Sequence, residues 1–387
     1  MSDPTGPDSL GDMLPLEPPA SASATPAATP DVSRALAVVS RLARNHALSD
    51  ELRSLLEGKL GTAVAAAADY AADAIAPATR TAYIRDWHVF ASWCREQGAD
   101  PNALPVHPVL AAAYLASIAK TIGMSALRGR LAAIAYHHRR RGLIWSAAHP
   151  AIRETLAGIG RAHGKPVRPS AALTSVEVKQ LIAGCAGDLA GTRDRALFLV
   201  GFAGAFRRSE LVAIDVAHLR FEAGCVVIHI PRSKRDQEGK GADVTLPRMR
   251  GEDTGAVGGT GAVRETGAVS ETCPVRALET WLKQGKIRRG PVFRNISVHN
   301  SIEERLTGAG VRHILLRRAA TAKLVVPASE RLSPHGLRAG LITEAYLKGA
   351  PDEQVAAHTR HGDLSTMRGY RKRARITGDN PARLLDL

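Results

Sequence analysis

The sequence predicts a mainly α-helical protein with a small β-sheet, divided into two domains by a short linker. Apolar residues recur at spacings of three and four over much of residues 32–165, and again in the second domain at 174–387, as on one face of a helix. Two short segments, 225–230 and 242–246, alternate instead in the manner of strands. Residues 166–173 contain two prolines and an arginine, a composition typical of a linker.

Composition indicates the kind of partner. The 387 residues carry a formal net charge of +15, which favours a polyanion, with nucleic acid ahead of an anionic membrane surface. Charge alone also leaves open a merely basic soluble protein. The four cysteines show no CxxC spacing, which argues against a disulfide framework or a zinc ribbon. With neither a signal peptide nor a membrane-spanning apolar run in the sequence, we expect a cytoplasmic protein, associated with the nucleoid if bacterial.

The first domain begins after a tail. Residues 1–31 are rich in Pro, Ala, Ser and Thr, so we expect them to be disordered. The pattern of residues 32–76 predicts a helical extension that either packs on its own domain, the favoured alternative, or contacts a second protomer. The remainder predicts a compact helical unit, with helices at 78–94, 108–121, 125–141 and 151–163.

Several of these helices carry basic residues. Each basic run by itself suits a solvated surface, but several such faces in one small unit favour contacts with the DNA backbone. The candidate DNA contacts are Arg80, Arg85, Arg128, Arg130, His138, Arg139, Arg140 and Arg141, with Arg232 in the second domain.

The second domain opens with a capping box, Thr174 to Glu177, at the start of a helix. We expect further helices near 192–203 and 208–212, followed by the two strands of a small sheet. Residues 249–272 repeat Thr-Gly-Ala-Val every six residues and predict a flexible insertion. A helical pattern resumes at Pro274 and is expected to continue to residue 334.

Residues near the C-terminus include side chains that could take part in catalysis. His335 and Arg338 are three residues apart and would share a helix face. His361 and Tyr370 are nine apart and would point in opposite directions on one straight helix, so we expect a break between them. A phenol has a pKa near 10, and a nucleophilic tyrosine therefore needs cationic neighbours. The arginines and lysine around Tyr370 supply them.

Two earlier segments complete the set. Arg207 and Glu210 form an i, i+3 pair, and this partnership favours Arg207 over the adjacent Arg208. A lysine lies in the turn after the first strand, with Lys234 favoured over Lys240. Two arginines, a lysine, two histidines and a tyrosine suit a phosphodiester, because guanidinium forks clamp its oxygens and a tyrosine can attack.

Taken singly, each pair has a structural explanation: an intrahelical ion pair, a helix surface pair, or a half-buried core tyrosine. His358 and His361 could form half of a metal site, but neither a carboxylate nor a cysteine stands at ligand spacing. Walker A and HExxH motifs are also missing from the sequence, so we expect no cofactor and no metal.

In this order and at these spacings, the segments resemble the tyrosine recombinases, the phage integrase family that includes Cre, lambda integrase and the Xer proteins. The resemblance covers roughly residues 77–387. Its most specific parts are an Arg-x-Ser-Glu-Leu box at 207–211, a His-x-x-Arg box at 335–338 and a His-x8-Tyr box at 361–370. Together they are a strong signal, although any one alone would be weak.

The resemblance implies roles for the matching positions. Arg207 and Arg338 would bind the scissile phosphate, His361 would hydrogen-bond a non-bridging oxygen, and Glu210 would occupy the supporting acidic position. Tyr370 would form a 3′-phosphotyrosyl bond.

In the same scheme His335 would assist proton transfer, and Lys234 would be the general acid toward the departing 5′ hydroxyl. Such chemistry needs neither ATP nor metal, because the covalent intermediate retains the bond energy.

The resemblance also implies a fold and partners. The first domain would be a helical, SAM-like core-binding domain. The second would be a catalytic domain of the DNA breaking-rejoining type, mainly helical with a three-stranded sheet. The two would clamp double-stranded recombination sites, with a homotetramer performing site-specific recombination or integration. Two alternatives stay open: a type IB-like topoisomerase, and a catalytically inactive DNA-binding protein of the same fold.

Overall fold

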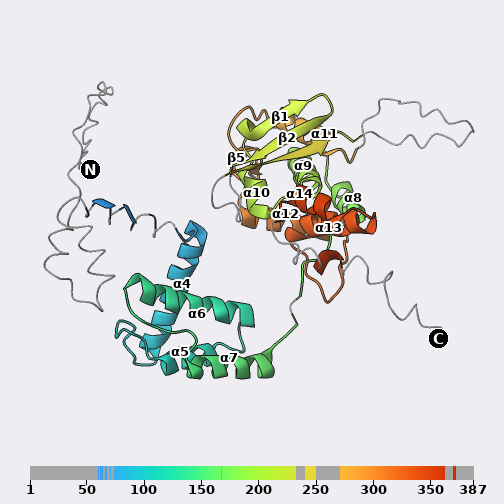
Figure 1. Cartoon of the computed structure of the whole chain (residues 1–387). Helices are drawn as coiled ribbons and strands as arrows, with labels where there is room; N and C mark the ends of the chain where they lie inside the picture. Colours follow the sequence, from blue (N-terminus) through green and yellow to red (C-terminus); the bar gives the residue numbers. More distant parts are fainter. Residues whose placement is uncertain are drawn as a thin grey trace, which may run out of the picture. The chain divides into compact units, whose positions relative to one another are not determined.

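The computed structural model describes residues 74–166, 168–231, 240–249, 271–361 and 369–371, with some residues between 60 and 70 (Figure 1). The chain divides into two compact units, Met1–Pro166 and Val167–Leu387. The predicted tail at 1–31 and nearly all of the insertion at 249–272 lie outside the described residues. None of the described helices is both long and apolar enough to cross a membrane.

The described part of the first unit is helical. Helices α4, α5 and α7 begin with a proline, whose missing N–H costs no hydrogen bond in the first turn. A histidine before the proline caps α5 and α7, since its side chain accepts a backbone N–H. The elements are α4 (Pro77–Glu96), α5 (Pro108–Ser117), α6 (Met124–Arg140) and α7 (Pro150–His163).

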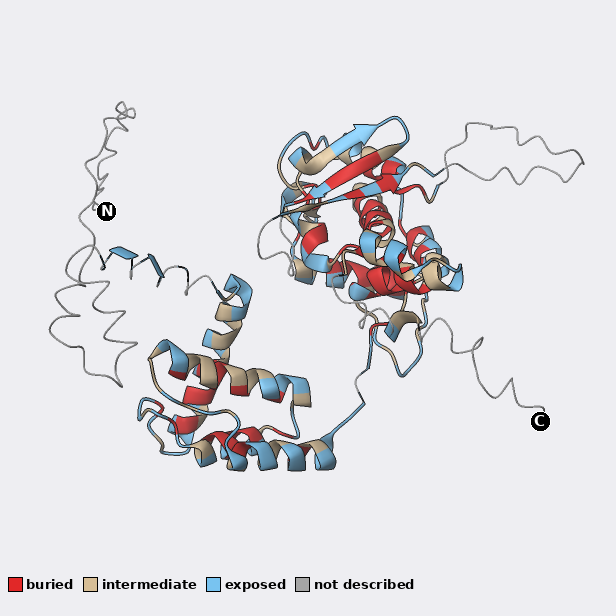
Figure 2. Ribbon diagram, viewed as in Figure 1, coloured by how far each residue is buried: buried red, intermediate tan, exposed pale blue. Residues whose placement is uncertain are grey.

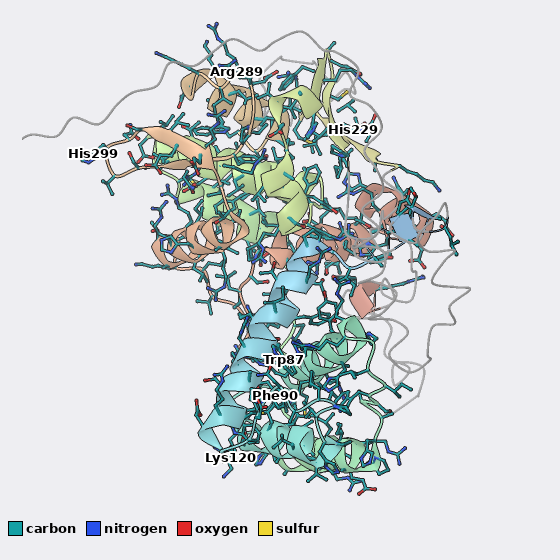
Figure 3. The ribbon with its side chains drawn as sticks, turned by 90° about the vertical axis from the view of Figure 1, so that its left-hand side faces the viewer. Trp87, Phe90, Lys120, His229, Arg289 and His299 are labelled. Atoms are coloured by element: carbon teal, nitrogen blue, oxygen red, sulfur yellow. The ribbon has the colours of Figure 1, made fainter. Side chains whose placement is uncertain are left out.

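An apolar core holds the described part of the first unit together. Helix α4 packs on α6 and α5 packs on α7. Trp87 and Phe90 of α4 meet Tyr114 and Leu115 of α5, and the rings of Phe90 and Tyr114 lie 5.1 Å apart in an edge-on arrangement. Figure 3 draws Trp87 and Phe90 on the side of α4 that faces these helices.

His138 belongs to this core, so the prediction that it contacts DNA is wrong. Its side chain is fully buried and its ring stacks on Trp145, with 4.9 Å between the ring centroids. Nε2 accepts the Val106 N–H at 2.9 Å, and Nδ1 lies 2.7 Å from the Ile134 carbonyl, to which it therefore donates. Burial lowers the pKa of His138, and the neutral ring is the form that fits both bonds.

The second unit is organised around α9, whose residues 196–200 are buried (Figure 2). Helices α8, α11 and α13 pack against it. The predicted capping box is present at α8, where the Thr174 N–H donates to Glu177 at 2.7 Å. The helices are α8 (Ser175–Ala183), α9 (Leu189–Ala203), α10 (Arg208–Ala213), α11 (Pro274–Gln284), α12 (Gly308–Thr321), α13 (His335–Leu347) and α14 (Asp352–Thr359), with a 3-10 turn η1 (Val216–His218).

The predicted three-stranded sheet is present, in the order β1-β2-β3 and antiparallel throughout. It consists of β1 (Leu219–Glu222), β2 (Cys225–Ile230) and β3 (Ala242–Pro247). Val226 pairs with Leu246 and Ile228 pairs with Val244. These buried side chains of the two longer strands therefore lie on the same face of the sheet and belong to the core around α9.

The expected helical continuation from Pro274 to residue 334 is wrong in its middle. A second antiparallel pair, β4 (Arg294–Ile296) and β5 (Ile302–Arg305), separates α11 from α12. Both strands are short and at most half-buried, and three of the four residues of β5 are charged. Such short segments leave no clear period in the sequence.

Residues 171–173 pack along α13, which corrects the linker predicted at 166–173. The Leu173 N–H donates to the Gly336 carbonyl at 3.0 Å, and Leu173 is fully buried. A Cβ on Gly340 would clash with the Leu173 backbone, so glycine permits the close approach. The later part of the predicted linker therefore belongs to the second unit and buttresses the helix that carries Arg338.

Candidate active site

Arg207 and Glu210 form the expected pair at the start of α10. Arg207 is the N-cap residue, and Glu210 accepts both its backbone N–H at 2.9 Å and its guanidinium Nη1–H at 2.5 Å. The Glu210 side chain is 2% exposed. Burial alone would raise the pKa of Glu210, but the two bonds from Arg207 and the charge of Arg360 lower it overall, which keeps the carboxylate ionised.

Arg338, on α13, is a buried cation held by backbone oxygens. It is 1% exposed, its Nη1–H donates to the Ala205 carbonyl at 2.6 Å, and its Nη2–H donates to the Thr359 carbonyl. Burial, and then the charges of Arg207 and Arg360, lower the pKa of Arg338 to about 10. The guanidinium therefore remains charged at neutral pH, and its position is fixed by two carbonyls from different elements.

His361 follows the end of α14 and lies beside Arg338. The Thr359 hydroxyl donates to the Val355 carbonyl at 2.6 Å and therefore accepts from His361 Nδ1–H, also at 2.6 Å. This assignment leaves Nε2 as the acceptor of an Arg338 N–H, 3.2 Å away. The expectation that His361 stands at the end of one helix and Tyr370 on the next agrees with α14 and a helical segment at 369–371.

Tyr370 is the last of the predicted site residues along the chain. Its hydroxyl lies 3.0 Å from Nε2 of His335, the exposed first residue of α13. Its ring is half-buried against a small cluster that includes Ile342, and its centroid lies 6.3 Å from that of His361. Five predicted residues, Arg207, His335, Arg338, His361 and Tyr370, are thus brought together with Glu210.

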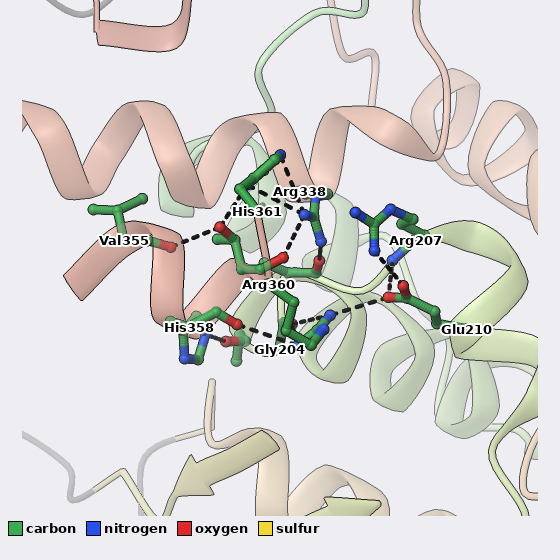
Figure 4. A network of polar contacts seen from close by, with 11 residues as sticks. Gly204, Arg207, Glu210, Arg338, Val355, His358, Arg360 and His361 are labelled. Atoms are coloured by element: carbon green, nitrogen blue, oxygen red, sulfur yellow. Dashed lines mark hydrogen bonds and ion pairs between the residues drawn. The ribbon is translucent and has the colours of Figure 1, made fainter. Parts of the chain in front are cut away.

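Arg360 is a member of this cluster that sequence reasoning missed. Its Nη2–H donates to Glu210 at 3.0 Å, and its guanidinium lies 5.2 Å from the centroid of the Phe206 ring. Figure 4 shows Arg360 and Arg207 reaching Glu210 from different elements. The sequence signal was the Thr-Arg-His triplet itself, an arginine standing where a helix that ends before His361 would favour glycine.

The remaining predicted residues of the second domain fall elsewhere. Lys234 and Arg232 lie outside the described residues. Lys240 is exposed just before β3. Arg208 is exposed and lies beside Gly308 at the start of α12, so the bonds to Glu210 belong to Arg207.

The basic residues of the first unit differ in their surroundings. Arg85 and Arg130, from α4 and α6, both pair with Asp86, at 2.9 and 2.8 Å. Arg80 and Arg141 are half-buried. The exposed arginines at or near the ends of α6 are Arg128, Arg139 and Arg140.

The described residues contain no group of three or more His, Cys, Asp or Glu side chains that could hold a metal ion. His358, half of the metal site weighed from the sequence, instead lies 2.7 Å from the Ala203 carbonyl through Nε2. Together with Arg338 on Ala205, and Arg360 on Gly204 at 3.4 Å, it caps the C-terminal end of α9.

Comparison with known proteins identifies the family. A model of the phage integrase family matches residues 171–375, which include every member of the cluster described above. The chain belongs to the phage integrase family. It is a site-specific recombinase of the tyrosine type. An integrase/recombinase XerD homologue from Selenomonas ruminantium is 31% identical over 311 residues, which cover 78% of this chain and 83% of the relative.

A solved structure of the family shares the fold. A lambda integrase dimer bound to a COC′ core site matches with a TM-score of 0.51 at 14% identity, over 90% of this chain and 88% of the other. At that identity the likeness concerns the fold alone. It agrees with the predicted class, a mainly helical protein with small antiparallel sheets.

Proposed function

We propose that this recombinase cuts and rejoins duplex DNA through a 3′-phosphotyrosyl intermediate on Tyr370. The observation that carries the proposal is the 3.0 Å contact between the Tyr370 hydroxyl and His335 Nε2, one helical turn from the buried Arg338 cation. A phenol needs a proton acceptor and nearby positive charge to attack, and this arrangement supplies both.

The cations are suited to a phosphodiester that becomes more negative as it is attacked. Among the described residues, the Ala205 and Thr359 carbonyls and His361 engage three of the five N–H donors of Arg338, which leaves two that could bind a non-bridging oxygen. Arg207, held by Glu210, supplies a second guanidinium. Preorganised charges of this kind stabilise the transition state because they need no rearrangement during reaction.

In the cleavage step, the Tyr370 oxygen bonds to phosphorus and the bond from phosphorus to the 5′ oxygen breaks. The phenol proton passes to His335, and the departing 5′ oxygen receives a proton from Lys234, or from Lys240 as the alternative. Rejoining reverses these changes, with a 5′ hydroxyl of the partner strand attacking the phosphotyrosine. The chemistry consumes no ATP and needs no metal, because the covalent bond stores the energy.

The proposed substrate is a pair of double-stranded recombination sites. The net charge of +15 supports contact with the DNA backbone, as does the fold shared with a lambda integrase bound to DNA. We extend the proposal to a clamp in which residues 32–165 and 174–387 hold the duplex, and to a tetramer that exchanges strands.

The test uses nicked suicide duplexes that carry candidate sites from the DNA flanking the gene. Wild-type protein should form a protein–DNA adduct that survives a denaturing gel, and Tyr370→Phe should form none. An adduct that persists in Tyr370→Phe would mean that another residue attacks. Relaxation of a plasmid without paired sites would favour topoisomerase activity, and binding without any adduct would favour an inactive DNA-binding protein.

A further inference from the structure

We propose that Arg360 is a positioning residue for DNA cleavage, joining the two arginines of the site through its side chain and its backbone. The proposal rests on the proposed function. It assigns a role to the residue that lies between the end of α14, at Thr359, and His361. Arg360 is placed so that the Arg207 and Arg338 sides of the site both depend on it.

The side chain fixes the Arg207 side. Arg360 is 11% exposed and pairs with Glu210 at 3.0 Å, while Glu210 holds Arg207 at 2.5 Å. Glu210 therefore lies between two guanidinium groups and cannot move toward one without leaving the other. The Phe206 ring lies under the Arg360 guanidinium and limits its motion.

The backbone fixes the Arg338 side. Arg360 has φ 57° and ψ 46°, a left-handed conformation at the end of α14. This turn presents the Thr359 carbonyl to Arg338 and brings the His361 N–H to the Ala356 carbonyl at 3.0 Å.

Left-handed backbone is unfavourable for arginine, and glycine usually occupies such a position at a helix end. The Arg360 Nε is also buried without a hydrogen-bond partner among the described residues. Both features disfavour an arginine that had only to end a helix. They are consistent with a side chain retained for its contact with Glu210, since local strain of this kind collects at functional sites.

The two roles can be separated by substitution. Arg360→Gly keeps the left-handed turn and removes the contact with Glu210. Arg360→Lys keeps the positive charge but lacks the forked guanidinium group. Lys323→Gly is the matched control, because Lys323 is exposed, has φ 51° and follows the end of α12. Both glycine substitutions relieve left-handed backbone, but only one touches the site.

Single-turnover cleavage of the suicide duplex should slow by about tenfold to a hundredfold in Arg360→Gly, as expected for a misplaced catalytic group. Arg360→Lys should recover part of that loss, and Lys323→Gly should cleave like the wild type. DNA binding in a gel-shift assay and thermal unfolding show whether each variant is folded.

The pH profile distinguishes positioning from a general loss of structure. The groups that face Glu210 are Arg207 and Arg360, with Arg338 nearby, and loss of one cation raises the pKa of the carboxyl. The acid limb of the cleavage profile should therefore move to higher pH in Arg360→Gly. On a Glu210→Gln background the same substitution should have little further effect, because the partner is already altered.

A wild-type rate and pH profile in Arg360→Gly would overturn the proposal, as would an undiminished effect on the Glu210→Gln background. Failure of the proposed function would look different, since the wild type itself would then form no adduct. If Arg360→Gly does not fold, Arg360→Lys still decides, because wild-type cleavage by that variant would contradict a role for the fork.

Discussion

The candidate active site has a buried side and an exposed side, and they are built differently. Glu210 and Arg338 are almost completely buried, and each is bonded to groups from other elements. His335 is exposed and Tyr370 half-buried, and the contact between them is a single hydrogen-bond distance. The charges proposed to bind the phosphate are therefore part of the core, whereas the proposed attacking group, Tyr370, is only half-buried.

This difference predicts that substitutions on the buried side affect folding and cleavage together, whereas substitutions on the exposed side affect cleavage alone. The predictions below test that separation.

The largest effect is expected for Arg338→Ala. The Ala205 and Thr359 carbonyls would lose a charged donor in a buried place, which should cost about 2–5 kcal/mol of the free energy of unfolding. Cleavage should be lost as well. Chemical denaturation measures the first effect and the suicide duplex the second. Arg312→Ala, an exposed arginine of α12, is the control and should change stability by about 0.5 kcal/mol or less. Equal stability of the two variants would contradict the account.

Tyr370→Phe should abolish the covalent adduct while changing the free energy of unfolding by about 0.5 kcal/mol or less, because only a hydroxyl at the edge of the site is removed. Tyr346→Phe is a matched control, since Tyr346 packs against the same small apolar cluster. It should keep the adduct. A large loss of stability in Tyr370→Phe would show that the exposed side is also part of the core.

Acid should weaken the buried side through Glu210. Its pKa is lowered in the folded protein, so the carboxylate contributes stability above the unfolded value near 4.5, and that contribution is lost as the pH falls through the folded pKa. Denaturation midpoints of wild type and Glu210→Gln between pH 3 and 7 should therefore converge in acid. Parallel curves would mean that Glu210 does not supply this linkage.

The smallest effect concerns the first unit. Arg140→Ala removes an exposed charge and should lower the slope of log affinity against log salt by about one, with stability unchanged. His138→Gln should leave the slope unchanged and lower the stability, because His138 is a core residue. Fluorescence-anisotropy titrations at several salt concentrations would measure the slopes. A reduced slope in His138→Gln alone would restore the original prediction for that residue.

The sequence predicts the longer elements well because their periods are clear. Strand β3 alternates over its six residues and β2 is mostly apolar over six, whereas β1, β4 and β5 have three or four residues each, too few to show a clear pattern. His138 was misplaced because it stands in a basic run. The core face of α6 nevertheless carries Leu131 and Ile134, and His138 follows Ile134 by four residues on that face.

The site is predictable where it depends on side-chain types at fixed spacings, as for His335 and Arg338. It is not predictable where it depends on backbone. Ala205 and Arg360 both have positive φ, 45° and 57°, which direct a carbonyl and a side chain into the site. The pair of Arg360 and Glu210 joins residues 150 positions apart, a contact that only the fold creates.

The most direct test of the central claim is to identify the amino acid that carries the DNA. Wild-type adduct would be digested with nuclease to leave a nucleotide remnant and then cleaved before aspartate, which releases residues 363–378, a fragment whose only tyrosine is Tyr370. Fragmentation in a mass spectrometer should place the remnant on Tyr370. A remnant on any other residue would contradict the assignment of the nucleophile and the division of the site described here.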